Sequence, residues 1–76
     1  MARNTKIDWR NLARIRRSRG ESQEAFWARF GVTQSGGSRY ESGRQLPAPA
    51  AILIALYLSG TIDDKALEKA RRLASV

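Results

Sequence analysis

Two short helical segments follow each other with almost no linker between them, and this spacing restricts the fold more than any other feature of the chain. Ser22 is a suitable N-cap for the first segment, and Gly31 is typical of the left-handed residue just beyond a helix end. Only Val32 separates that glycine from Thr33, which can cap the second segment. The sequence therefore predicts a helix-turn-helix over about residues 22–42.

The same start and stop signals predict three further helices and no strands. One helix begins after the N-cap Asp8 and ends near Gly20. The segment Leu46–Pro49 leads into a helix over about Ala50–Ser59, because proline is accepted in a first helical turn. Asp63 caps the last helix. The inward stripe predicted for this helix consists of Ala66, Ala70, Leu73 and Ala74. The fold class is therefore all-α, a compact five-helix bundle.

Length and composition restrict the class of protein. A chain of 76 residues with 42% hydrophobic residues can form one modest core, which we assign to residues 8–76 after an N-terminal arm over 1–7. The chain has no cysteine and no histidine, so it lacks thiolate ligands and the commonest general base. Because it also shows no acid–base pair and no nucleophile beside a base, we expect neither an enzyme nor a cofactor.

The charge indicates an anionic partner. Fourteen Lys and Arg against seven Asp and Glu give a net charge of +7, which suits nucleic acid or an anionic membrane surface. A membrane-surface protein needs a basic face opposite an apolar one, whereas these cations gather in the first helix and around the third. The longest nearly apolar run, Ala48–Leu58, is too short to cross a membrane, and no signal peptide is apparent. We therefore expect a cytoplasmic protein without a membrane partner.

The second helix of the helix-turn-helix has one hydrogen-bonding face. At 100° per residue, Tyr40 and Glu41 fall on the same side as Gly37. The opposite side carries Ser35, Ser38, Arg39 and Ser42. Gln34 lies in the first turn, from which side chains reach base edges when a helix end enters a major groove.

Over residues 12–58 the chain resembles the phage repressor and Cro-like helix-turn-helix family, also called the XRE family. The residues that carry the resemblance are Arg16, Gly20, Ser22-Gln23, Phe26, Gly31-Val32-Thr33-Gln34-Ser35, Ser38-Arg39-Tyr40-Glu41, Gly43 and Pro47. The resemblance implies a lambda-repressor-like fold and a sequence-specific transcriptional regulator, a repressor, that binds double-stranded DNA.

The resemblance also implies which residues contact DNA. The implied base contacts are Gln34, Ser35, Ser38 and Arg39. The implied phosphate contacts are Gln23, Thr33, Ser42 and Arg44. These assignments agree with chemistry, since glutamine suits the adenine edge and arginine suits guanine or phosphate. By the same resemblance Arg16 pairs with Glu41, which would tie the first helix to the end of the recognition helix.

Two residues depart from the family pattern. Trp27 stands where such proteins carry a small alanine, and Gly37 stands where they carry Ile or Val. These positions face each other across the turn, so we expect the indole to fill the space that the glycine leaves. Gly36 has no such partner. It either allows a close approach to a phosphate or is merely tolerated.

Oligomeric state and partners remain open at this point. The helix over 50–59 is apolar nearly all round, so Leu53 and Tyr57 either form a homodimer interface or lie beneath the last helix. A dimer would match a palindromic operator. The arm over 1–7, with Arg3 and Lys6, either touches DNA or frays. An alternative function is that of an antitoxin-like protein, which binds a partner protein through its last two helices and regulates its own operon.

Overall fold

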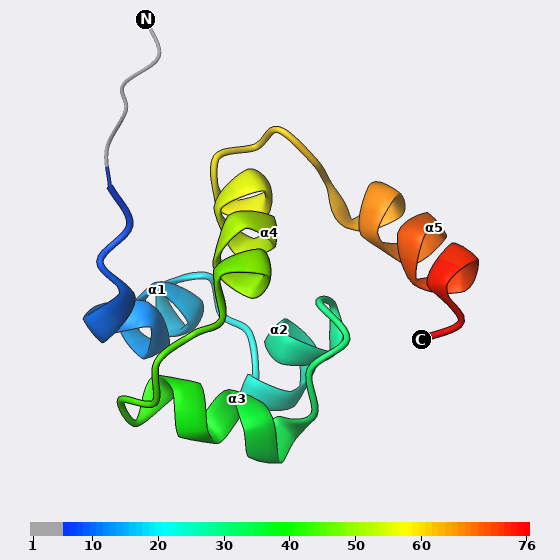
Figure 1. Cartoon of the computed structure of the whole chain (residues 1–76). Coiled ribbons are helices and arrows are strands. Elements are labelled where there is room, and N and C mark those ends of the chain that lie inside the picture. The colour runs from blue at the N-terminus through cyan, green and yellow to red at the C-terminus, as the bar shows by residue number, and fades with distance from the viewer. Residues whose placement is uncertain (1–5) are drawn as a thin grey trace, which may run out of the picture.

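The computed structural model describes residues 6–76 of the chain. This part is entirely helical, with five α-helices after one turn of 3-10 helix (Figure 1). The elements are η1 (Trp9–Asn11), α1 (Leu12–Ser18), α2 (Gln23–Ala28), α3 (Gln34–Glu41), α4 (Ala48–Leu58) and α5 (Asp64–Ala74). The all-α five-helix prediction is confirmed. Among the helices described, none combines the length and apolar character needed to cross a lipid bilayer.

The turn between α2 and α3 is built by the residues that the sequence indicates. The side-chain oxygens of Ser22 and Thr33 each accept a 3.1 Å hydrogen bond from a backbone N–H in the first turn of their helix. Gly31 has a φ of 77°, a left-handed conformation that strains other residues. The Val32 N–H donates to the Trp27 carbonyl oxygen (3.0 Å), which closes the end of α2. The two helices are thus joined at a fixed angle.

The core lies where α1, α2 and α4 meet over α3 (Figure 1). Leu12 on α1, Phe26 and Trp27 on α2, and Ile54 on α4 form its buried centre. The rings of Phe26 and Trp27 meet edge to face, with centroids 5.4 Å apart. The half-buried side chains packed around this centre are Trp9, Ile15, Phe30, Val32, Tyr40, Leu46 and Leu58. Both helices of the helix-turn-helix are therefore packed on a single apolar cluster.

Two helix starts differ from the sequence prediction. Asp8 caps the first helix by accepting from the Arg10 N–H (3.2 Å), but the turn that follows is 3-10 before the α-helix begins. The fourth helix starts at Ala48, two residues earlier than expected, with Pro47 as its N-cap. Pro49 then lies inside the first turn, where its missing N–H costs no hydrogen bond. Neither difference moves the helix-turn-helix.

Polar contacts attach α5 to the rest of the domain. The Asp64 carboxylate accepts from Arg29 Nε (2.5 Å) and from the Tyr57 hydroxyl (3.2 Å). Arg71 donates through Nη1 to the Arg29 carbonyl oxygen (2.7 Å). Leu67 is the buried apolar residue of this helix. The contacts of α5 therefore reach back to α2 and α4.

The inward stripe predicted for the last helix is wrong. Its members Ala66, Ala70, Leu73 and Ala74 are all exposed, and Leu73 is 79% exposed. The contacts of Asp64 and Arg71 hold the Leu67 side of α5 against the domain, and Ala66 and Leu73 lie about 100° or more from Leu67 around the helix. Ala70 and Ala74 lie within about 60° of Leu67 but are exposed, so helical position alone does not decide which residues of this helix are buried.

Candidate nucleic-acid interface

The outer side of α3 presents hydrogen-bonding side chains to solvent. Ser35 and Arg39 are exposed and Ser38 is half-buried, whereas Gly37 on the opposite side is buried. Gln34 is exposed at the start of the helix. An amide, two hydroxyls and a guanidinium supply the donors and acceptors that match base edges. All four predicted base-contact residues thus lie on one helix, and Gln34 is its first residue.

The four predicted phosphate-contact residues differ in how available they are. Thr33 and Arg44 are exposed. The Ser42 hydroxyl donates to a carbonyl oxygen one turn earlier in α3 (2.8 Å). Gln23 is half-buried, and its Nε2 donates to Glu41 Oε1 (3.0 Å). Arg44 is therefore the member that presents a full positive charge to solvent.

The carboxylate of Glu41 accepts hydrogen bonds from three side chains, those of Arg16, Gln23 and Trp27. We call these three residues together with Glu41 the Glu41 cluster. Arg16 on α1 donates through Nε to Oε2 (2.8 Å) and through Nη2 to Oε1 (3.1 Å). Gln23 and Trp27 donate from α2, the latter through Nε1 to Oε2 (2.7 Å). The side chain of Glu41 is 5% exposed. One carboxylate at the end of α3 thus holds that helix to both α1 and α2.

The charges in the Glu41 cluster are stable at neutral pH. Burial by itself would raise the pKa of Glu41, but the hydrogen bonds from Arg16, Trp27 and Gln23 outweigh it, so this pKa lies below its usual value. The hydrogen bond to Glu41 raises the pKa of Arg16 despite burial. Both side chains stay ionised, and the pair can act as a permanent connection between α1 and α3.

Trp27 and Gly37 lie directly against each other, as their departure from the family pattern suggests. A Cβ added to Gly37 would lie within 3.0 Å of the indole atoms Cγ, Cδ1 and Cδ2. Gly36 is different, because a Cβ there would lie 3.1 Å from Val32 Cγ1 and 3.3 Å from Thr33 Oγ1. The indole therefore occupies the position of a side chain at residue 37, and only tight packing surrounds residue 36.

A comparison with protein-family models identifies this architecture. The model for the RsaL-like helix-turn-helix domain matches residues 13–57, more than half of the chain. The chain belongs to the RsaL-like helix-turn-helix family. The RsaL-like span includes every residue assigned above to base or phosphate contacts, and it leaves out η1 and α5.

A solved structure agrees with the RsaL-like assignment. The quorum-sensing repressor RsaL of Pseudomonas aeruginosa is 45% identical, with a TM-score of 0.72, and the match covers 82% of this chain and 97% of that one. A comparison with curated proteins found no significant match. The matched family is thus RsaL-like, and membership of the phage repressor and Cro-like family is not confirmed.

Of the two alternatives left open for Tyr57, a dimer contact or cover within the domain, the observed burial fits the second. Tyr57 is 7% exposed, and its hydroxyl accepts from Arg19 Nη2 (3.1 Å) while donating to Asp64 of α5. The Arg29 guanidinium covers the ring at 4.7 Å from its centroid. Leu53 is half-buried. The aromatic ring that seemed available to a second copy is thus covered from α1, α2 and α5.

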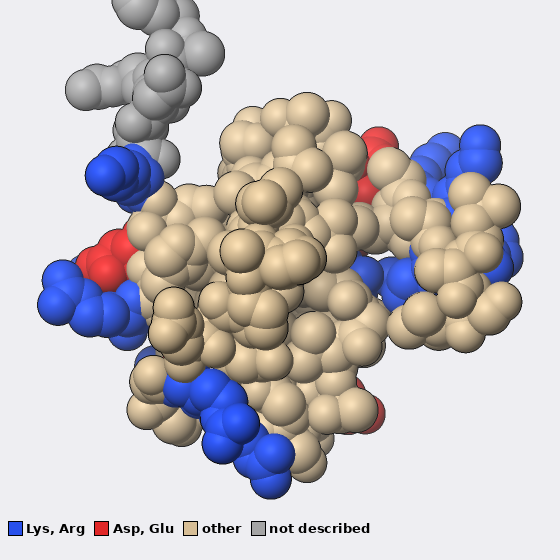
Figure 2. All heavy atoms as spheres, viewed as in Figure 1, with Lys and Arg blue, Asp and Glu red and all other residues tan. Residues whose placement is uncertain are grey.

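A different face of α4 is open. Ile52 is 62% exposed and Leu56 is 38% exposed, and Ala48 and Pro49 beside them are exposed as well. These four residues, which we call the α4 face, contain no polar side chain. Figure 2 shows uncharged side chains over this part of the molecule, with the visible charged groups around its edges. The helix α4 therefore has an exposed apolar surface, but Tyr57 is not part of it.

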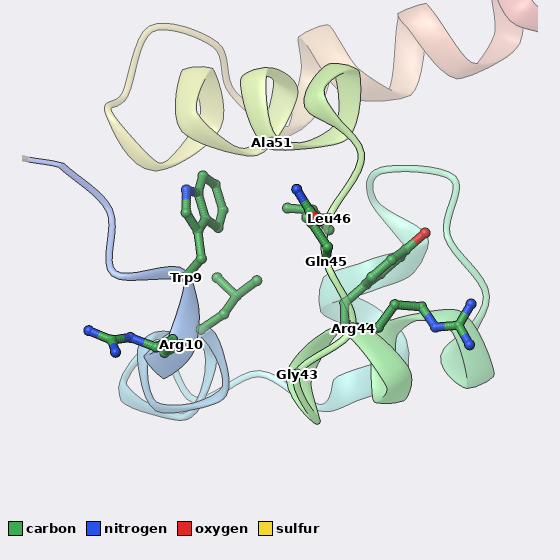
Figure 3. Close-up of a pocket in the computed structure, with 9 residues that line it drawn as sticks. Trp9, Arg10, Gly43, Arg44, Gln45, Leu46 and Ala51 are labelled. Atoms are coloured by element: carbon green, nitrogen blue, oxygen red, sulfur yellow. The ribbon is translucent and has the colours of Figure 1, made fainter.

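A shallow groove of about 370 Å³ separates η1 from the loop after α3. Trp9 and Gln45 point into it from opposite sides beneath Ala51 of α4, whereas Arg10 and Arg44 point outward (Figure 3). Neither arginine therefore places its charge inside the groove. The sequence did not indicate it, because its walls come from segments that lie 28 or more residues apart in the chain.

The predicted N-terminal arm lies mostly outside the described residues. Arg3 falls in that part, so its proposed contact with DNA stays a prediction. Lys6 and Asp8 are exposed and Ile7 is half-buried. The first capped turn of the domain begins at Asp8, where the sequence places the domain boundary.

Proposed function

We propose that this protein is a transcriptional repressor that reads operator DNA in the major groove with α3. The observation that carries the proposal is the outer face of α3, with Gln34, Ser35 and Arg39 exposed on a helix whose inner face is fixed by the core and by Glu41. The RsaL relative, described as a quorum-sensing repressor, and the net charge of +7 support the same function.

Each residue of this face has a proposed role. Gln34 pairs with an adenine edge and Arg39 with a guanine edge, the pairings that their bidentate geometry favours. Ser35 and Ser38 make shorter contacts to neighbouring bases. Arg44 holds a phosphate as a full charge. Thr33, Ser42 and Gln23 place hydroxyl and amide groups at the backbone on either side.

Affinity measurements on two variants test this division of roles. Gln34→Ala should lower affinity for a duplex selected from a random pool by about 1 to 3 kcal/mol and barely change affinity for a scrambled duplex. Arg44→Ala should weaken binding to both duplexes and reduce the slope of log affinity against log salt by about one. Equal losses on the two duplexes for Gln34→Ala would reject it as a base-reading residue.

We further propose that the repressor acts as a homodimer on a palindromic operator, and that the α4 face forms the contact. A two-fold axis places the same apolar patch of each copy against the other, so a small uncharged surface is used twice. Ile52 and Leu56 are the side chains that gain most from this burial. The absence of charge on the α4 face suits the approach of two strongly basic molecules.

The comparisons give no support to the antitoxin alternative. The matched family and the solved relative both concern DNA-binding regulation, and neither describes a toxin partner. A repressor role also implies a cytoplasmic location, beside the operator DNA. We therefore retain one function, repression through DNA binding.

A further inference from the structure

One side chain of α2 touches three positions on the inner face of α3. The Trp27 indole packs against the backbone at Gly37, and its ring centroid lies 5.6 Å from that of Tyr40. Its Nε1 then donates to Glu41 Oε2 (2.7 Å). These three positions cover more than one turn of α3 on the side opposite Ser35 and Arg39. Trp27 thus contacts α3 along much of its length.

The geometry of these contacts fixes both the distance and the rotation of α3. Trp27 is fully buried, and the edge-to-face contact with Phe26 holds its ring. Because Gly37 has no side chain, the flat indole sets how close the α3 backbone comes to α2. The hydrogen bond to Glu41 lies off the helix axis, so it resists rotation of α3 about that axis.

Small rotations of α3 matter for base reading. Side-chain ends lie roughly 6 Å from a helix axis, so a rotation of about 10° moves them about 1 Å. Hydrogen bonds to base edges require donor–acceptor distances within a few tenths of an ångström. Phosphate contacts by Arg44 tolerate such a shift, because a flexible charged side chain can follow the phosphate. Loss of rotational control would therefore harm selectivity more than general affinity.

We propose that Trp27 is a positioning residue for base reading, which uses its indole N–H and the absent side chain at Gly37 to set the rotation of α3 against α2. This inference rests on the proposed function of α3 and deepens it. Trp27 is a core residue, and in addition its hydrogen bond to Glu41 determines how well Gln34 and Arg39 are placed to bind their bases.

Trp27→Phe separates the two roles, because phenylalanine keeps an aromatic ring in the core and removes the N–H. The probes are a duplex selected from a random pool and a scrambled duplex of the same length, both at one salt concentration. Trp27→Phe should weaken binding to the selected duplex by about tenfold, because a rotated α3 weakens the hydrogen bonds of Gln34 and Arg39 to their bases. Binding to the scrambled duplex should fall by less than about twofold. Equal losses on both duplexes, or no loss, would overturn the proposal.

Leu67→Ala is the matched control for lost stability. Leu67 is buried like Trp27, but it lies on α5, whose polar contacts are with α2 and α4. At a temperature where this variant is folded, the ratio of its affinities for the selected and scrambled duplexes should equal that of the unmodified protein. A lowered ratio for Leu67→Ala would show that any core defect reduces selectivity, and the special role of Trp27 would then be rejected.

A measurement on the unmodified protein keeps the inference testable if Trp27→Phe does not fold. Hydrogen exchange of the Trp27 Nε1–H, followed by NMR, should be slower in the complex with the selected duplex than with the scrambled one. Equal protection in the two complexes would contradict the proposal. A failure of the proposed function looks different, because the unmodified protein would then bind both duplexes equally well.

Discussion

At the contact between Trp27 and Gly37, a large side chain on α2 fills the space that a missing side chain on α3 leaves. Gly37 gives α3 no side chain at this position, and the Trp27 indole from α2 lies within 3.0 Å of where a Cβ of residue 37 would be. A glycine inside a helix costs about 1 kcal/mol relative to alanine. Burial of the complete indole offsets this cost, since Trp27 is 0% exposed.

The exchange of volume predicts strong coupling between the two positions. Trp27→Ala should lower the free energy of unfolding by about 3 to 5 kcal/mol, because it leaves a large cavity. Gly37→Ile should also destabilise, because its side chain would overlap the indole. The double variant should recover part of the loss, with a coupling energy of at least about 1 kcal/mol in urea unfolding. Additive losses would show that the two residues act independently.

Gly36→Ala is the control for this cycle. Alanine favours the helix by up to about 1 kcal/mol, but its Cβ would lie 3.1 Å from Val32 Cγ1. The two effects oppose each other, so we expect little net change in the free energy of unfolding. Any coupling of Gly36→Ala with Trp27→Ala should be close to zero, since residue 36 does not touch the indole.

The element that gives the domain its proposed function, α3, is fixed by a charge rather than by apolar burial alone. Its last residue, Glu41, accepts from Arg16, Gln23 and Trp27, so α1 and α2 both hold the end of α3. Such a carboxylate is costly if left without its partners. The recognition helix should therefore depend on the ionisation of a single group.

The stability of the domain should fall in acid because of Glu41. Its pKa is lower in the folded chain than the ordinary 4.5, so its ionised form stabilises the fold above that pH. This contribution is lost as the pH falls through the depressed folded value. Glu41→Gln should lower the free energy of unfolding by roughly 3 kcal/mol at neutral pH and make its decline in acid shallower. Thermal melts between neutral pH and pH 3 would measure both effects.

Glu24→Gln removes the same charge from an exposed position on α2 and serves as the control. It should leave the acid decline of the unmodified protein in place. If Glu41→Gln and the unmodified protein lost stability in parallel as the pH fell, another carboxylate would be responsible.

At the scale of the whole molecule, a net charge of +7 coexists with an uncharged exposed face on α4 (Figure 2). The charge attracts DNA and separates copies of the protein in solution. The α4 face works in the opposite direction, since burial of Ile52 and Leu56 favours association. Bound DNA neutralises the repulsion, so dimerisation and operator binding should support each other.

Substitutions on the α4 face should separate folding from dimerisation. Ile52→Glu or Leu56→Glu should give a folded monomer by sedimentation, because a charge on a two-fold axis meets its own copy. Each variant should bind a palindromic duplex much more weakly than the unmodified protein. Leu73→Glu alters an even more exposed apolar residue, on α5, and should change neither property. A monomeric unmodified protein, both free and on the duplex, would exclude this interface.

The sequence by itself determined the helices and the turn that joins two of them. Local signals suffice for this, because Ser22, Gly31 and Thr33 act on backbone groups within four residues. The outer face of α3 follows from the helical period alone. The facing pair Trp27 and Gly37 was also accessible, through the resemblance to the phage repressor and Cro-like family, whose pattern places these two positions across the turn.

Tertiary structure decided what depends on residues far apart in the chain. The contact between Arg29 and Asp64, separated by 35 positions, helps to orient α5, so the sequence pattern alone predicted an inward stripe whose members are all exposed. The same contacts bury Tyr57, which the apolar pattern of α4 left available for a dimer. The hydrogen bond from the indole N–H of Trp27 to Glu41 depends on how α2 and α3 pack, so the sequence pattern did not predict it. Periodicity identifies which residues share a face, but only packing and paired polar groups decide what that face meets.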